Sequence, residues 1–470
     1  MRKPVAAINN GVCGKNLFHS RFTPFLTLAI ALFVPACVGS SDRDAVEKEK
    51  SMISAPMEGV DSKRAKREAE FQKDRKDPLK NPVQDKATIE VAAPTFGYGK
   101  KAEIEIQRES PRAAKIGVLA PITGELEFYG NEAMNGAELA SEELDAAGGV
   151  KGQMFEMVVY DTKGSVGETQ KGVDALLDQK TLAVVGAGTG EVSFSATKLV
   201  NDHQLILVSA GSRRRLGDSG PYNFRITLDD DSAIKELVGY IVANKKWKNF
   251  ALFSSLTNDY SVRLNATFKA EIINQKLNVS DELFLWGKGM TNVSEEDTSI
   301  SAQLAKLKKN PPDALVYTGD AEEAKNLIIE MRKQGINIPI VGGEDIMAPE
   351  FASLGQKAEG TLVYGGFNPD SSNPKVRKFV EGYRKHFKKE PSRLSALAYD
   401  AFNVIVEGIK AAPSLRPSHV REAMNVIKGF EGVTGKITFT ESREALKEPF
   451  IFEMVKKDGK YKFVCVKDAT

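Results

Sequence analysis

After Arg112 the chain alternates short apolar runs with longer stretches of helical periodicity, and this alternation is what most restricts its fold. The apolar runs are Lys115–Ala120, Phe155–Tyr160, Leu182–Val185, Leu205–Ser209, Phe250–Ser254, Ala314–Tyr317, Pro339–Val341 and Thr361–Tyr364. The helical stretches include Gly167–Asp178, Asp231–Lys245, Asp259–Lys276, Ala321–Gln334 and Pro374–Phe387. Such alternation predicts an α/β fold, with parallel sheets covered by helices on both faces. Because about 350 residues exceed one hydrophobic core, we expect two lobes.

The first of these units places candidate ligand contacts in a loop. Lys115–Ala120 reads as a strand, Pro121 to Gly124 break it, and helical spacing of apolar residues starts at Tyr129. In an open α/β sheet the loop that leaves the carboxyl end of a strand faces the ligand crevice. Thr123, Phe128 and Tyr129 are therefore candidate ligand contacts.

The C-terminal end of the chain has a different pattern. Thr434–Thr440 reads as a short strand, and Pro449–Val466 reads as an antiparallel hairpin whose tight turn is Asp458-Gly459.

The N-terminus is an export signal rather than part of the fold. Basic residues precede the apolar run Phe25–Val34, which is too short to span a bilayer. Val34-Pro35-Ala36-Cys37 resembles a bacterial lipobox, although Pro35 is unusual in one. Residues 1–36 would then be a lipoprotein signal peptide and Cys37 the acylated residue. A plain signal followed by a coincidental cysteine is the alternative.

Residues 37–112 form a tether in this interpretation. The segment is dense in charges of both signs and poor in large apolar residues, so it cannot bury enough surface to offset its ordering entropy. The formal net charge of the whole chain is only +2, which gives no support to a nucleic-acid partner. Membrane attachment would come through the lipid on Cys37.

Several motifs in the folded region point together to a known family. Among them are KIGVLAPITGELEFYG, LAVVGAGTGEVS, LILVSAGS, PIVGGED and ALAYDAFNVI, in this order along the chain. With these motifs, residues from Ala114 to about Val466 resemble the type I periplasmic binding proteins for branched-chain amino acids, the ligand-capturing components of ABC importers.

The resemblance implies two Rossmann-like lobes joined by a three-segment hinge that closes on a ligand. The N-terminal lobe would take residues 113–228 and 367–440, and the C-terminal lobe residues 229–366 and 441–470. It also implies a monomer that captures an amino acid or a similar small polar molecule and delivers it to an ABC permease. We expect no cofactor and no metal.

The resemblance also implies how an amino acid would be held. Two loops would bind its carboxylate, with Ser212 as one hydroxyl donor, while Gly190 stands where the family has a second. The carbonyl of Ala210 would receive the ammonium group. Glu344 matches the family's ammonium-binding glutamate, and Asp230 matches an aspartate near the same group. Plain alternatives are solvated carboxylates for the two acids and a helix N-cap for Ser212.

Three further positions complete the implied site. Tyr129 and Tyr260 fall at aromatic walls of the cleft, with ordinary packing as the alternative. Asp320 stands where the family often has an aromatic residue. Three acids around one cleft favour a polar ligand or one with an extra positive charge, rather than leucine, isoleucine or valine. We read Arg213-Arg214-Arg215 as an exposed solubilising run, with anion recognition as the alternative.

Of two alternative functions, the sequence supports one better than the other. An enzyme is disfavoured because the glycines at 186, 188 and 190 do not complete a Rossmann fingerprint and no catalytic constellation surrounds a histidine. The stronger rival is a ligand-sensing or scaffold lipoprotein of the same fold, such as a penicillin-binding-protein activator, because fold alone does not fix function.

Overall fold

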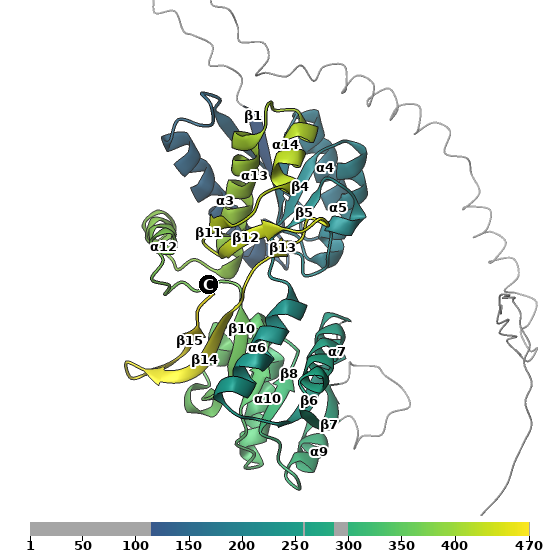
Figure 1. The fold of residues 1–470 in the computed structure, drawn as a ribbon, viewed down its shortest axis with the longest axis vertical. Coiled ribbons are helices and arrows are strands. Elements are labelled where there is room, and N and C mark those ends of the chain that lie inside the picture. The colour runs from purple at the N-terminus through teal and green to yellow at the C-terminus, as the bar shows by residue number, and fades with distance from the viewer. Residues whose placement is uncertain (1–113, 257–258, 286–298, 470) are drawn as a thin grey trace, which may run out of the picture. The chain divides into compact units, whose positions relative to one another are not determined.

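Two large β-sheets, each covered by helices on both faces, organise the chain (Figure 1). The structure, a computed structural model, describes residues 114–256, 259–285 and 299–469, and all of these belong to one unit of the chain. The predicted signal peptide (1–36), tether (37–112) and acylated Cys37 lie outside the described residues. Among the helices that are described, none combines the length and the apolar character needed to cross a membrane.

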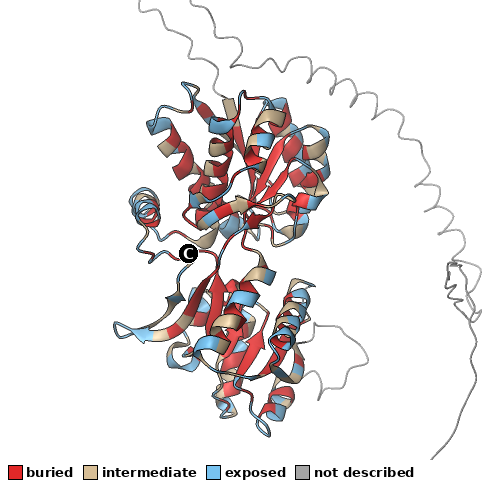
Figure 2. Ribbon diagram, viewed as in Figure 1, coloured by how far each residue is buried: buried red, intermediate tan, exposed pale blue. Residues whose placement is uncertain are grey.

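The first sheet is wholly parallel, with the order β2-β1-β3-β4-β5. Its strands are β1 Ala114–Ala120, β2 Phe155–Asp161, β3 Ala183–Gly186, β4 Ile206–Ser209 and β5 Asn223–Arg225. Every residue of β3 and β4 is buried (Figure 2). This explains why both strands read as unbroken apolar runs, since strands in the centre of a parallel sheet are covered on both faces.

Helices from distant parts of the chain cover the first sheet. They are α3 Glu127–Ala146, α4 Val166–Asp178, α5 Gly190–Asp202, α12 Pro374–Phe387, α13 Arg393–Ala411 and α14 Pro417–Asn425. α3, α13 and α14 pack on one face, α4 and α5 on the other, and α12 packs against α3. α3 and α13 approach closely at Gly136, where an added Cβ would lie 2.0 Å from the carbonyl oxygen of Ser395.

The second sheet has seven strands in the order β15-β14-β10-β9-β8-β6-β7. They are β6 Asn249–Ser255, β7 Asn278–Leu285, β8 Ala314–Tyr317, β9 Ile340–Gly342, β10 Leu362–Gly365, β14 Phe450–Lys457 and β15 Lys460–Lys467. The strands from β6 to β10 are parallel, and the C-terminal hairpin β14–β15 adds to β10 antiparallel. The C-terminal hairpin therefore extends the second sheet at its β10 edge.

Helices also cover both faces of the second sheet. α6 Asp230–Asn244 and α7 Asp259–Asn274 pack on one face. α9 Ile300–Leu307, α10 Ala321–Lys333 and α11 Pro349–Ala352 pack on the other, with the short 3-10 helices η2 Glu344–Ile346 and η3 Gly355–Ala358. A further 3-10 helix, η1 Gly217–Ser219, precedes β5 in the first lobe.

The chain passes between the lobes three times: between β5 and α6, between β10 and α12, and before β14. A small sheet precedes the third crossing and is formed by β11 Phe430–Gly432, β12 Gly435–Phe439 and β13 Ala445–Leu446. Glu444 forms a bridge with Arg225 of the first sheet. We therefore place the third crossing after residue 446 rather than after residue 440.

Lys447, at the start of the third crossing, is a buried cation. Its Nζ donates to the carbonyl oxygen of Ile226 (3.1 Å) and to the hydroxyl of Thr434. Asp400 accepts from the same Thr434 hydroxyl (2.5 Å). Burial lowers the pKa of Lys447 to about 8, although the nearby Asp400 carboxylate opposes this shift. The crossing thus contains a base that deprotonates more easily in the folded protein than in the unfolded chain.

We expect this lysine to make stability rise with pH on the alkaline side. Between pH 8 and pH 10.5 the unfolded chain binds more protons at Lys447 than the folded protein does, so unfolding becomes less favourable as pH increases. The free energy of unfolding of the wild type, minus that of Lys447→Met, should rise by about 3 kcal/mol across this window. Urea titrations of both proteins from pH 7 to pH 10.5 measure the difference. A difference that stays level or falls would contradict the expectation.

Candidate functional site

A cavity of about 860 Å³ lies where elements of both lobes meet. From the first lobe it is lined by the start of α5, the loop after β4, and β5; from the second it is lined by the starts of α6 and α7. Its lining residues are Thr189, Gly190, Glu191, Arg213, Arg214, Arg215, Arg225, Asp229, Asp230, Asp231, Asp259, Tyr260 and Arg263. The lining is rich in charges of both signs, which suits a polar guest.

Arg213 extends from the loop after β4 and contacts three carboxylates of the second lobe. Its Nη1 donates to Asp230 Oδ1 (3.2 Å), and its Nη2 lies 2.8 Å from Glu344 Oε1 and 2.7 Å from Asp345 Oδ1. Only 15% of the Arg213 side chain is exposed. Burial by itself would lower the pKa of Arg213, but the three carboxylates outweigh burial and raise it well above its usual value.

The predicted solubilising run is therefore wrong for Arg213, because its side chain is mostly buried in ion pairs. Arg214 and Arg215 are exposed. The guanidinium of Arg214 stacks on the ring of Phe194, 3.6 Å from the ring centroid. The guanidinium of Arg215 donates to Asp229 (3.0 Å). The run divides into one residue whose side chain is mostly buried and two exposed residues at the cavity surface.

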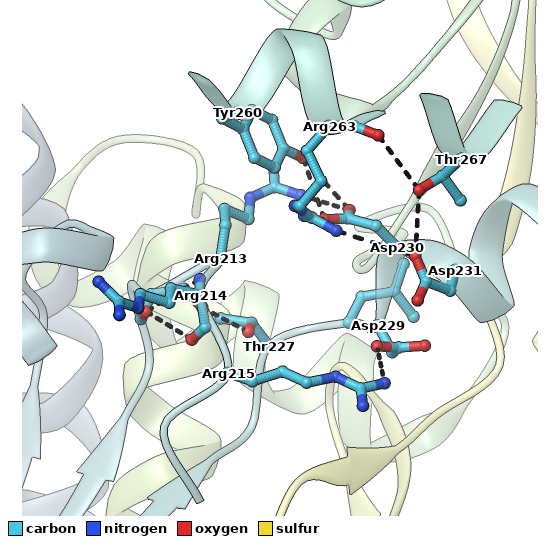
Figure 3. A network of polar contacts seen from close by, with 12 residues as sticks. Arg213, Arg214, Arg215, Thr227, Asp229, Asp230, Asp231, Tyr260, Arg263 and Thr267 are labelled. Atoms are coloured by element: carbon cyan, nitrogen blue, oxygen red, sulfur yellow. Dashed lines mark hydrogen bonds and ion pairs between the residues drawn. The ribbon is translucent and has the colours of Figure 1, made fainter. Parts of the chain in front are cut away.

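Asp230, the first residue of α6, is the common acceptor of the network. Figure 3 shows the side chains of Arg213, Arg263 and Tyr260 converging on it. Its oxygens accept from Arg263 Nη2 (2.9 Å), from the Tyr260 hydroxyl (3.2 Å) and from the Tyr364 hydroxyl (2.8 Å), as well as from Arg213. Burial raises the pKa of Tyr260, so this phenol stays protonated and donates. Asp230 is 4% exposed and is not a solvated loop carboxylate.

Glu344, in η2, is likewise buried and paired. Its Oε2 accepts from the N–H of Gly366 (2.8 Å), and its Oε1 lies 3.1 Å from Nη1 of Arg393. Arg393, the first residue of α13, belongs to the first lobe, so it also bridges the lobes. Asp230, Glu344 and Asp345 are thus matched by Arg213, Arg263 and Arg393. The chain itself supplies the positive charge that the sequence led us to expect on a ligand.

The structure gives Asp320 a different role. Asp320 is the N-cap of α10, where its Oδ1 accepts from the N–H of Glu323 (2.8 Å). It is exposed and does not line the cavity. The third acid of the network is instead Asp345, which follows Glu344 directly and pairs with Arg213, and which we did not predict.

The predicted carboxylate-binding loops lie at the cavity, but not all of their side chains face it. Gly190 begins α5 and lines the cavity, so the unpaired N–H groups of the first helical turn are nearby. Ala210 and Ser212 are fully buried. The Ser212 hydroxyl donates to the carbonyl oxygen of Arg214 (2.8 Å) and accepts its N–H (3.1 Å). This bond closes a turn, and no helix begins at Ser212, so its N-cap interpretation is wrong.

The two predicted aromatic walls have different surroundings. Tyr260 lines the cavity, and the guanidinium of Arg213 lies 5.5 Å from its ring centroid. Tyr129 is 51% exposed at the start of α3, in edge contact with Phe128, and is not among the lining residues. Three further residues of the network carry no local signal in the sequence, and only the fold brings them to the site: Arg263, Tyr364 and Arg393.

One cluster among the described residues has the geometry to hold a metal ion. Ligand atoms of Glu138 and Glu142, on α3, and of His386, on α12, lie within 4.8 Å of one another. Glu142 and His386 already pair at 3.1 Å. The cluster is largely exposed and contributes nothing to the cavity lining.

Comparison with known proteins decides the family. The sequence profile of periplasmic binding proteins matches residues 113–460. The chain belongs to the periplasmic binding protein family. Leu/Ile/Val-binding protein homolog 1 of Brucella suis is 27% identical to this periplasmic binding protein over 358 residues, which are 74% of this chain and 92% of the relative.

Solved structures give the same result. The leucine-binding protein LivK of Thermotoga maritima is 26% identical, with a TM-score of 0.62 over 75% of this chain and 98% of its own. LivJ of Streptococcus pneumoniae, solved with isoleucine, is 27% identical, with a TM-score of 0.62 over 75% of this chain and 100% of its own. These neighbours confirm the predicted type I fold of two Rossmann-like lobes joined by three crossings.

Proposed function

We propose that this periplasmic binding protein is the extracytoplasmic solute-binding lipoprotein of an ABC importer and that it captures a small polar ligand between its lobes. The observation that carries the proposal is the charged cavity lined by residues of both lobes. Its position at the loops that follow β3 and β4 is where open α/β sheets bind ligands. The names of the Brucella, Thermotoga and Streptococcus relatives support binding and transport rather than catalysis.

The capture mechanism follows from the fact that each lobe contributes its own residues to the cavity lining. An anionic end of a ligand can meet the free N–H groups at the start of α5, beside Gly190 and Arg214, since a helix N-terminus favours negative charge. The second lobe presents Tyr260 from the opposite side. A ligand that contacts both lobes favours the closed arrangement, which a permease can distinguish from the open one.

A calorimetric and thermal-shift screen of amino acids, amides, organic acids and sugars tests this function on the full mature chain. A ligand at one hundred times its Kd should stabilise the protein by about 2.7 kcal/mol. Arg214→Ala should reduce that stabilisation, because Arg214 lines the cavity. Lys198→Ala is the matched control, since Lys198 is 81% exposed and pairs with Asp202 on the same helix, α5. No response of the wild type to any solute would refute capture.

The lipid anchor is part of the proposal, because Cys37 follows an apolar signal run and a lipobox-like tripeptide. In cells fed radiolabelled palmitate, the wild type should carry label and Cys37→Ser should lose it completely. An exported, unlabelled wild type would show that the signal is a plain one. The tether would hold the binding lobes away from the membrane surface.

One observation favours a second candidate, a ligand-sensing or scaffold lipoprotein such as a penicillin-binding-protein activator. Arg213 and Arg393 already tie the two lobes together through the chain's own carboxylates. A scaffold needs such a fixed arrangement, whereas a transporter component must open. Binding of a cell-wall synthase to the mature chain, unaffected by Arg214→Ala, would favour this candidate.

A further inference from the structure

The acids that face the interlobe contact are already occupied by the chain's own donors. Asp230 and Glu344 have side chains that are 3% and 4% exposed, and each of their oxygens accepts from at least one protein group. Asp345 is 37% exposed and pairs with Arg213. A cationic ligand group could reach the two buried acids only by displacing a protein donor.

Arg213 is the donor that a ligand would have to displace, because its guanidinium contacts all three acids. Its two terminal nitrogens contact different elements of the second lobe. Nη1 contacts Asp230 of α6, and Nη2 contacts Glu344 and Asp345 of η2. The planar guanidinium fits such paired acceptors better than an ammonium group does. With Arg263 and Arg393 included, three arginines face these three acids, and a fourth acid, Asp231, lies 3.8 Å from Arg263 but has a side chain that is 57% exposed. An added ammonium would leave an unmatched positive charge in a mostly buried site, and that is unfavourable.

We propose that Arg213 is a specificity-determining residue that occupies the cation position of the cleft, so that the cleft takes polar ligands without an amino group and discriminates against amino acids. The inference rests on the proposed solute-binding function and narrows its ligand class. The remaining acids of the lining that have exposed side chains, Glu191, Asp231 and Asp259, are in contact with solvent and attract an ammonium group only weakly.

Matched ligand pairs test the discrimination. Leucine and 4-methyl-2-oxopentanoate, or glutamate and 2-oxoglutarate, differ only at the position of the amino group. Where a pair binds the wild type, the oxo acid should bind at least tenfold more tightly in calorimetry. Arg213→Ala frees the buried acids and should reverse this preference, whereas Arg213→Lys keeps the charge and should retain it. Equal or tighter binding of the amino acids by the wild type would overturn the inference while leaving solute capture intact.

A second measurement decides the matter if neither member of a pair binds the wild type. Millimolar ethylguanidinium should raise the melting temperature of Arg213→Ala by several degrees, because it refills the vacated position, and should leave the wild type unchanged. Arg214→Ala is the control and should not respond, since its guanidinium stacks on Phe194 rather than on an acid. A folded Arg213→Ala that ignores ethylguanidinium overturns the inference. If that variant does not fold, Arg213→Gln takes its place in the same measurement.

Discussion

Arg225→Met should lower the free energy of unfolding by roughly 3–5 kcal/mol, because it leaves a buried carboxylate without its cation. Arg225 is 1% exposed at the end of β5, and its guanidinium contacts Glu444, which is 5% exposed. The N–H groups of Leu216 and Gly217 also donate to Glu444, both at 2.9 Å, but they are neutral. Urea unfolding, followed by circular dichroism, measures the loss.

Two variants separate this charge effect from a packing effect. Arg225→Met combined with Glu444→Gln should be more stable than Arg225→Met alone, because the second change removes the orphaned charge. Arg215→Met is the surface control: Arg215 pairs with Asp229 while 57% exposed, so its loss should stay below about 1 kcal/mol. If the double variant is the less stable of the two, the buried-charge explanation fails.

Asp230→Asn should lower the free energy of unfolding by roughly 3 kcal/mol, because an amide has one acceptor oxygen where the carboxylate has two and carries no negative charge. The amide places a donor against Arg213 or Arg263, and only one oxygen remains for the Tyr260 and Tyr364 hydroxyls. We expect a smaller effect than at Arg225, because 48% of the Arg263 side chain is exposed and water can solvate it.

Asp231→Asn is the matched control for this measurement. Asp231 is the next residue of α6 and adds the same charge to the helix N-terminus, but 57% of its side chain is exposed. Its substitution should change the free energy of unfolding by less than about 1 kcal/mol. Equal losses from the two variants would mean that the helix dipole, rather than the interlobe network, makes Asp230 important.

The elements of the fold were largely predictable because each carries a local signal. The helix over Pro374–Phe387 begins at a proline, and the strand Ala314–Tyr317 is a bounded apolar run; both ranges match the structure. The hairpin turn at Asp458-Gly459 has positive φ at both residues, 55° and 77°, as a two-residue turn of this kind requires.

The site was less predictable, because the partners of its side chains come from distant parts of the chain. Nothing near Arg213 in the sequence shows that Glu344, 131 residues further on, will face it. Asp320 is the exception, since an overlooked local signal did exist. An acid followed three residues later by Glu323, ahead of an apolar helical pattern, is typical of a helix N-terminus.

The packing of α13 on α3 has a consequence for how the protein is made. These helices share the core of the first lobe, although the beginning of α3 at Glu127 and that of α13 at Arg393 are separated by more than half of the chain. A nascent polypeptide that has not yet reached Arg393 lacks one side of that core and holds its apolar strands uncovered. Translocation can therefore proceed with the chain still unfolded, and the first lobe is completed only after most of the protein has left the ribosome.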